Sequence, residues 1–312
     1  MLRFAVFTIG LFTLFACNTN SSSPESSNEH GTPAASASTA SEEAQTAPPA
    51  PDSLTEIRFD RLTAHARSEA LHEASLGRAM QSIGQQLIGS PYLEHTLDTP
   101  PDERLVTRLD GFDCVTFVEV ALALGRGVYA QDYSFAGYAD RLQEQRYRDG
   151  ATPGYCERLH YFSEWIADNH DRGIVRDITA DLGGERVDRS LTFMSENREA
   201  YARFANDDSL YACIQEMEAS LQARSHHWHV VPEDQIDAVA SQIEAGDILG
   251  FATDIGGLDI AHTGLAFRGE NGQLGVLHAS LSGEVLVSPD LQRYVQQIGH
   301  QIGIVVARPQ VR

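Results

Sequence analysis

Apolar positions divide the chain into a helical first part and a strand-rich last part. Between residues 54 and 89 they recur every three or four residues, which predicts a helical region. An unbroken apolar run from Val115 to Leu124 predicts a buried helix that begins at Cys114, after a loop. The same helical spacing is found at residues 138–145, 155–168 and 196–222.

The pattern changes from residue 229 onward. Short β-type segments are separated there by Gly, Asn and Asp, and they lie at 247–253, 263–267, 274–281, 285–288 and 301–307. Helices that precede an antiparallel sheet define the α+β class. A helical insertion of about 150–228 is expected between the two parts, with a mixture of extended pieces and loop at 173–194.

The N-terminus has the pattern of an export signal. Residues 2–16 contain one Arg and an apolar stretch that is too short to span a membrane, and Cys17 follows. Leu14-Phe15-Ala16-Cys17 resembles the lipobox of bacterial lipoproteins, which implies a signal peptide at 1–16 and a lipid on Cys17. Asn18 is not the aspartate of an inner-membrane retention signal, so we expect a periplasm-facing protein anchored to the outer membrane. The alternative is a secreted protein with an ordinary signal.

Residues 18–53 are rich in Ser, Thr, Ala and Pro and contain no aromatic residue. Such a segment buries too little apolar surface to offset the entropy of ordering, so we expect 17–53 to be a disordered tether that starts at the lipidated cysteine. About 35 residues of this kind span roughly 30–35 Å. The folded domain is then 54–312.

Charge and cysteine count limit the partners and the compartment. The net charge of −21 leaves no basic stripe for phosphates, so no nucleic-acid partner is expected. Of four cysteines, lipidation removes Cys17 and leaves three in an oxidising compartment. Either Cys156 and Cys213 form a disulfide, or both are buried free thiols. In the first case Cys114 alone stays free.

Cys114 is the candidate nucleophile. It follows Asp113, a residue suited to cap a helix, and it opens the apolar run. Free amides and the positive end of the helix dipole favour thiolate over thiol at such a position. A lone cysteine is otherwise often a buried core residue.

Two histidines supply the candidate base and its partner. His262 and His278 lie in neighbouring predicted strands, and the turn between these strands is about 269–273. A five-residue loop pairs residue 268 with 274, which places the two histidines on one face as diagonal neighbours. One imidazole then acts as base toward the thiol, and the other fixes its tautomer.

Six blocks, in order, resemble a known family. They are GSPYLEHTLD, FDCVTFVEVALAL, ERLHYFSEWIADN, GDILGF, DIAHTGLAF and VLHASLSGEV, and they cover roughly residues 70–308. They are similar to the N-acetylmuramoyl-L-alanine amidase-like branch of the NlpC-type cysteine peptidases. That resemblance implies a papain-like fold, with a catalytic cysteine at a helix N-terminus packed on an antiparallel sheet.

The resemblance also implies roles for particular residues. Cys114 corresponds to the nucleophile, His262 to the general base and acid, and His278 to the orienting third member. Tyr92 corresponds to a tyrosine near the thiolate or the oxyanion. The insertion block supplies Arg158, His160 and Tyr161, for which substrate contact and burial in a helix are equally open.

The expected function is hydrolysis, by a cysteine amidase, of the bond between N-acetylmuramic acid, including its anhydro form, and L-alanine. The alternatives are a γ-D-glutamyl–diamino-acid endopeptidase of the stem peptide and an inactive peptidoglycan-binding lipoprotein. His226-His227-Trp228-His229 has no nearby acidic or Cys ligand at metal spacing, so no metal and no other cofactor is expected. We expect a monomer whose partners are peptidoglycan or muropeptides, and which meets a membrane only through its lipid.

Overall fold

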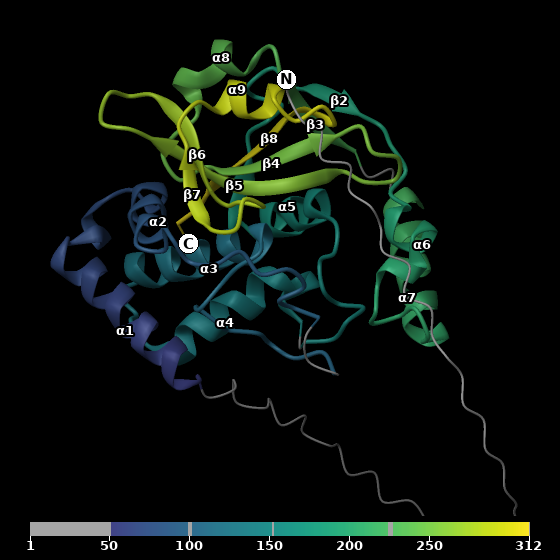
Figure 1. Ribbon diagram of the computed structural model, residues 1–312, viewed down its shortest axis with the longest axis horizontal. Helices are drawn as coiled ribbons and strands as arrows, with labels where there is room; N and C mark the ends of the chain where they lie inside the picture. Colours follow the sequence, from purple (N-terminus) through teal and green to yellow (C-terminus); the bar gives the residue numbers. More distant parts are fainter. Residues whose placement is uncertain (1–50, 99–101, 152, 224–226, 312) are drawn as a thin grey trace, which may run out of the picture. The chain divides into compact units, whose positions relative to one another are not determined.

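The computed structural model describes residues 51–98, 102–151, 153–223 and 227–311, and these belong to one compact unit (Figure 1). The signal peptide predicted at 1–16, the lipidated Cys17 and nearly all of the predicted tether lie outside the described residues. Within the described ranges, no helix is both long enough and apolar enough to cross a membrane.

Four helices form the first part of the domain: α1 (Ser53–Ser68), α2 (Leu76–Gln85), α3 (Cys114–Tyr129) and α4 (Phe135–Arg146). The helical region predicted at 54–89 is interrupted between α1 and α2. Ala70 adopts a left-handed conformation with φ 48° there, and the short 3₁₀ turn Leu71–Glu73 follows. Ser75 then caps α2, because its hydroxyl accepts from the amide of Arg78.

An antiparallel sheet forms the second part. Its strand order is β2-β3-β8-β4-β5-β6-β7, and β1 pairs with β8 outside this path. The bounds are β1 (Val175–Asp177), β2 (Glu185–Val187), β3 (Trp228–Pro232), β4 (Ile248–Thr253), β5 (Ile260–Arg268), β6 (Leu274–Ala279), β7 (Val285–Ser288) and β8 (Gln301–Pro309).

The sheet separates two apolar clusters. Figure 1 shows α3 on one side of the sheet and the short helices at the top of the view on the other. Leu265 and Leu277 pack with the buried residues of α3 in the larger cluster. Leu249 and Phe251 pack in the smaller one, where they meet the short helices α8 (Ile236–Val239) and α9 (Leu291–Gln296). Alternation along the strands therefore buries both faces, and it holds α3 firmly against β5.

The predicted insertion at about 150–228 is only partly helical. It contains α5 (Phe162–Asp171), α6 (Phe193–Glu196) and α7 (Asp208–Ala223), but β1 and β2 in the same segment join the sheet. The helix predicted at 155–168 begins seven residues later, because Arg158 pairs with Tyr147 in an isolated β-bridge. The remaining 3₁₀ turns are Arg148–Gly150, Arg198–Ala200 and Ala240–Gln242.

A disulfide joins Cys156 to Cys213, so the first of the two alternatives for these cysteines is confirmed. Cys114 is free and partly exposed.

Candidate functional site

Asp113 fixes the start of α3 and therefore the position of Cys114. Its Oδ1 accepts the amide of Thr116 at 2.8 Å, and the Thr116 hydroxyl accepts the Asp113 amide at 3.0 Å, which completes a capping box. Its Oδ2 accepts from the hydroxyl of Thr96 at 2.7 Å. The predicted cap is confirmed, and it places the thiol in the first turn, where main-chain amides have no helical partner.

The surroundings of Cys114 favour the neutral thiol. Burial raises its pKa to about 11, and the neighbouring Asp113 carboxylate adds to the rise. The main chain and side chain of Thr263 and the main chain of Val115 act in the opposite direction, but more weakly. Desolvation therefore opposes the thiolate that the helix start favours.

The two histidines meet as the sequence predicts. Residue 268 pairs with 274 across β5 and β6. His262 Nε2 and His278 Nδ1 lie 2.7 Å apart. Gly264 allows this close pairing, because a Cβ at that position would lie 3.0 Å from the Cβ of His278.

A third strand extends the hydrogen-bonded chain. His278 Nε2 lies 3.1 Å from Ser288 Oγ on β7. His278 pairs with Leu286, so Ser288 is its diagonal neighbour on the same face. Sequence analysis missed Ser288, although the strand 285–288 was predicted and the same alternation of side chains would have identified it.

This chain of contacts couples the protonation of the two rings. Burial lowers the pKa of His262 to about 3 and that of His278 to about 4, so both rings are neutral at neutral pH. If His262 donates through Nε2 to His278 Nδ1, then His278 donates through Nε2 to Ser288. His262 Nδ1 is then left as an unprotonated acceptor, which is the form that a general base requires.

Cys114 lies near the strand that carries His262. Thr263, which acts on the sulfur, directly follows His262. The ring centroid of Tyr294 lies 4.9 Å from that of His278 and 6.3 Å from that of His262. Burial raises the pKa of Tyr294, and charge on Cys114 raises it further. Tyr294, which sequence analysis missed, is therefore a neighbour of all three groups.

Tyr92 also lies near the sulfur. Burial is the largest cause of its raised pKa, followed by charge on Cys114 and on Asp113. Tyr92 forms a parallel bridge with Phe112, two residues before Cys114. The structure thus places Tyr92 beside the start of α3, as the family resemblance implies.

A cavity of about 250 Å³ opens beside Cys114 and is also lined by Arg158, His160 and Tyr161. Arg158 pairs with Asp98 at 2.6 Å. His160 Nε2 lies 2.7 Å from the carbonyl of Tyr155, and the Tyr161 hydroxyl donates to Glu218 at 2.7 Å. The polar groups of the three predicted substrate-binding residues thus contact protein partners, and these residues form part of the cavity wall.

The same cavity reaches a buried ion pair. Glu119 of α3 accepts from Arg146 Nε of α4 at 2.7 Å, and both side chains are 2% exposed. Glu119 is a single acidic residue in an otherwise apolar helix face. An acid in such a position indicates a buried charge that needs a partner.

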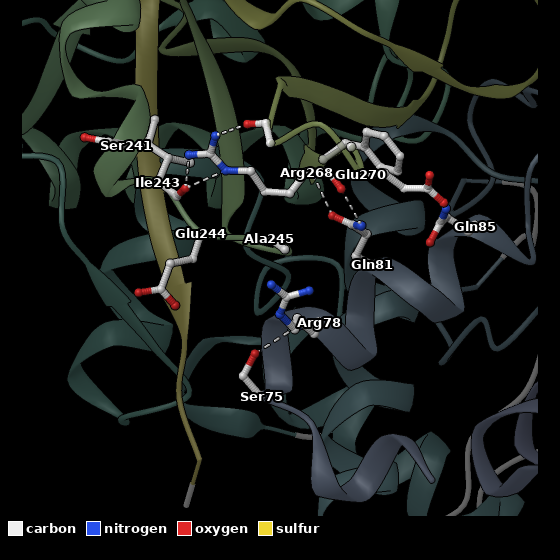
Figure 2. A pocket seen from close by; sticks show the side chains of 13 residues that line it. Ser75, Arg78, Gln81, Gln85, Ser241, Ile243, Glu244, Ala245, Arg268 and Glu270 are labelled. Atoms are coloured by element: carbon white, nitrogen blue, oxygen red, sulfur yellow. Dashed lines mark hydrogen bonds between the residues drawn. The ribbon is translucent and has the colours of Figure 1, made fainter. Parts of the chain in front are cut away.

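A larger cavity, of about 830 Å³, lies between α2 and the β5–β6 hairpin (Figure 2). Its polar groups hold the hairpin in place. Arg268 donates from Nε to the carbonyl of Ile243 at 3.1 Å and from its amide to Gln81 at 2.8 Å. Its lining contains neither Cys nor His, so it offers no nucleophile or base for the expected chemistry.

The histidine cluster at 226–229 is only partly described. The rings of His227 and His229 lie 6.3 Å apart, and His226 lies outside the described residues. No group of three or more His, Cys, Asp or Glu residues that could hold a metal ion occurs in the part of the chain that the structure describes.

Comparisons with known proteins show the family of the chain. A family model described as N-acetylmuramoyl-L-alanine amidase-like matches residues 82–304. An N-acetylmuramoyl-L-alanine amidase from Bacteroides uniformis is 33% identical, with a TM-score of 0.71, and the match covers 76% of this chain and 100% of that one. The chain therefore belongs to the N-acetylmuramoyl-L-alanine amidase-like family.

Two further structures are similar. A Bacteroides fragilis protein, named provisionally as a xylanase, is 33% identical with a TM-score of 0.66, and the match covers 72% of this chain and 98% of that one. A Legionella pneumophila protein is 21% identical with a TM-score of 0.59, and the match covers 82% of this chain and 97% of that one. At this identity the likeness shows the fold alone. A search of curated proteins finds no match.

Proposed function

We propose that this chain is a cysteine amidase with a papain-like arrangement, and that it hydrolyses the bond between N-acetylmuramic acid and L-alanine in peptidoglycan or muropeptides, including anhydro forms. Membership of the amidase-like family and the name of the Bacteroides uniformis structure support the reaction class. The observations that support the cysteine mechanism are the 2.7 Å contact of His262 with His278 and the free Cys114 at the start of α3.

The reaction starts from a neutral thiol and a neutral imidazole. The thiol turns from Thr263 toward His262 Nδ1 and gives up its proton as the sulfur attacks the lactyl carbonyl carbon. His278 accepts from His262 Nε2 and so stabilises the imidazolium that forms. Because neither group is charged at rest, proton transfer accompanies attack, and no preformed ion pair is needed.

The remaining steps use groups at the start of α3. The amide of Cys114 and the hydroxyl of Tyr92 donate to the oxyanion. His262 then protonates the nitrogen of L-alanine, the peptide leaves, and the lactyl group stays on sulfur as a thioester. Water, deprotonated by His262, hydrolyses the thioester and releases the muramic acid carboxylate.

Two alternative functions have less support than the amidase. An endopeptidase would use the same cysteine on a γ-D-glutamyl–diamino-acid bond, and an inactive lipoprotein would use the same cleft for binding alone. Glycosidase chemistry has less support, because it needs two free carboxyl groups. Asp113 caps α3, while Glu119 and Asp98 are paired with arginines in the cavity wall.

Product analysis by mass spectrometry tests the proposal. The compact unit from residue 47 is incubated with a muramoyl tripeptide of defined structure. We expect free tripeptide and free muramic acid, and Cys114→Ala should abolish both while the melting temperature stays within a few degrees. A shortened stem peptide would support the endopeptidase, and full turnover by Cys114→Ala would exclude this cysteine as nucleophile.

We also propose that the protein acts in the periplasm, anchored to the outer membrane through lipidated Cys17. The lipobox-like Leu14-Phe15-Ala16-Cys17 and the absence of aspartate at position 18 support this location. The Cys156–Cys213 disulfide is consistent with an oxidising compartment.

A further inference from the structure

The neutral state of the two paired histidines depends on their burial. His262 is 6% exposed and His278 is 1% exposed. Burial alone lowers the pKa of His278, and it is also the largest cause for His262, followed by the His278 ring. No charged side chain of the described ranges is among these causes. The groups that keep water away from the pair therefore decide its protonation.

Tyr294 of α9 covers this pair. Its ring centroid lies 4.9 Å from that of His278 and 6.3 Å from that of His262. It also packs edge to face on Phe251 of β4 at 5.1 Å, and Phe251 stacks on His262 at 5.7 Å. Because Tyr294 is partly exposed while both histidines are buried, the tyrosine forms part of the protein surface above the pair.

Other contacts of α9 hold Tyr294 in this position. Leu291 and Val295 of the same helix are buried in the smaller apolar cluster, and Asp290 caps the helix. A hydrogen bond with the side chain of Gln301 on β8 holds the phenol group. The position of the ring therefore does not depend on the histidines that it covers.

The remaining neighbours of this cluster of rings carry no charge at neutral pH. β7 contributes the hydroxyl of Ser288, which contacts the pair at 3.1 Å. The titratable groups beside the pair are Tyr294 itself and Cys114 of α3, which acts on Tyr294. Burial raises the pKa of both groups, so both are neutral. A change in hydration at Tyr294 would thus act on the pair without a competing charge.

We propose that Tyr294 is a positioning residue whose ring shields the His262–His278 pair from water, so that the pair serves as a base in acid as well as in neutral solution. The catalytic consequence rests on the proposed amidase function, but the shielding itself can be measured without a substrate. A hydrated pair takes up a proton more readily, and a protonated His262 cannot accept the proton of the thiol.

Titration of the full chain by nitrogen NMR tests the shielding directly. The signals of the two imidazoles are assigned by their loss in His262→Gln and in His278→Gln. In wild type we expect a pKa of about 3 for His262 and about 4 for His278. Tyr294→Ala lets water reach the rings, so it should raise both pKa values by about 1–2, toward the ordinary value of roughly 6.5.

The pH dependence of kcat/KM on a muramoyl tripeptide measures the catalytic consequence. Its acid limb reports the protonation of the base in the free enzyme, so Tyr294→Ala should lose activity at a pH that is higher by the same amount. Tyr294→Phe keeps the ring and should keep the wild-type limb. Tyr133→Ala is the matched control, because it removes a partly buried tyrosine that packs on Arg67 and lies outside the cavity beside Cys114.

Several results would overturn the shielding role. The first is an unchanged titration of both rings in Tyr294→Ala. The second is a change in Tyr294→Phe as large as that in Tyr294→Ala, which would assign the effect to the hydroxyl. If Tyr294→Ala does not fold, Tyr294→Leu takes its place, and it must raise both pKa values by a smaller amount.

Failure of the amidase function is a separate outcome. If wild type cleaves no muropeptide at any pH, the proposed function is rejected. The NMR titration still decides whether Tyr294 shields the pair, because it needs neither substrate nor turnover.

Discussion

At the scale of single residues, Asp113 both builds the site and opposes its ionisation. Its carboxylate caps α3 and, after burial, is the next cause of the raised pKa of Cys114. Asparagine caps helices about as well as aspartate but carries no charge. We predict that Asp113→Asn lowers the pKa of Cys114 from about 11 and speeds alkylation by iodoacetamide at pH 8 several-fold.

The raised pKa of Cys114 also predicts how its alkylation depends on pH. A raised thiol pKa means little thiolate at neutral pH, so alkylation of the wild-type unit from residue 47 should accelerate steadily from pH 8 to about pH 11. Asp110→Asn is the matched control, since Asp110 pairs with Arg108 at 2.7 Å and is not among the causes of the shift. A wild-type midpoint below pH 9 would contradict the neutral-thiol mechanism.

Ser288 provides a second prediction at this scale. Its hydroxyl lies 3.1 Å from His278 Nε2, so Ser288→Ala leaves that nitrogen without its partner and loosens the ring that orients His262. We expect kcat to fall about threefold to tenfold with KM unchanged, and Ser288→Thr to restore it. Ser282→Ala, an exposed change in the loop before β7, should have no effect, and full kcat in Ser288→Ala would rule out this role.

At the scale of elements, local sequence patterns predict the β5–β6 hairpin correctly but wrongly predict a helix in the segment before α5. Loop length and alternation were enough for β5 and β6, because both act over a few residues. Residues 155–161 have helical apolar spacing but are not helical. Arg158 pairs there with Asp98, 60 residues away along the chain, and such a distant partner leaves no local signal.

The Cys156–Cys213 disulfide can be tested at this scale. It closes a separation of 57 residues and joins the cavity wall at Tyr155 to α7. A closed loop of that size is worth about 4 kcal/mol in the chain-entropy model, and measured values are typically about 2–4 kcal/mol. We predict that Cys156→Ser/Cys213→Ser lowers the free energy of unfolding in urea by about 2–4 kcal/mol.

A reductant provides the control for this experiment. It should shift wild type toward the double variant and leave the variant unchanged, since Cys114 forms no disulfide. If the variant and wild type unfold at the same urea concentration, the two cysteines are not paired in solution.

At the scale of the whole molecule, β8 organises the sheet in a way that the sequence does not reveal. One edge of β8 pairs with β4, while its other edge pairs with β3 and, further along, with β1. Because β1 and β2 have three residues each, they are too short to show alternation. The sequence therefore predicts the sheet from residue 247 onward and extended pieces at 173–194, but it does not show that β1 and β2 join the sheet.

The proposed anchor is a property of the whole chain, and fractionation of cells can test it. Cys17→Ser removes the lipid acceptor, so we predict that the protein moves from the outer-membrane to the soluble periplasmic fraction. Its kcat/KM on a soluble muropeptide should not change, because Cys114 and the cavity lie in the unit that starts at residue 47. Asn18→Asp, which creates a retention-type signal, should instead move the protein to the inner membrane on a density gradient. A Cys17→Ser protein that stays with the outer membrane would show that the lipid on this cysteine is not the anchor.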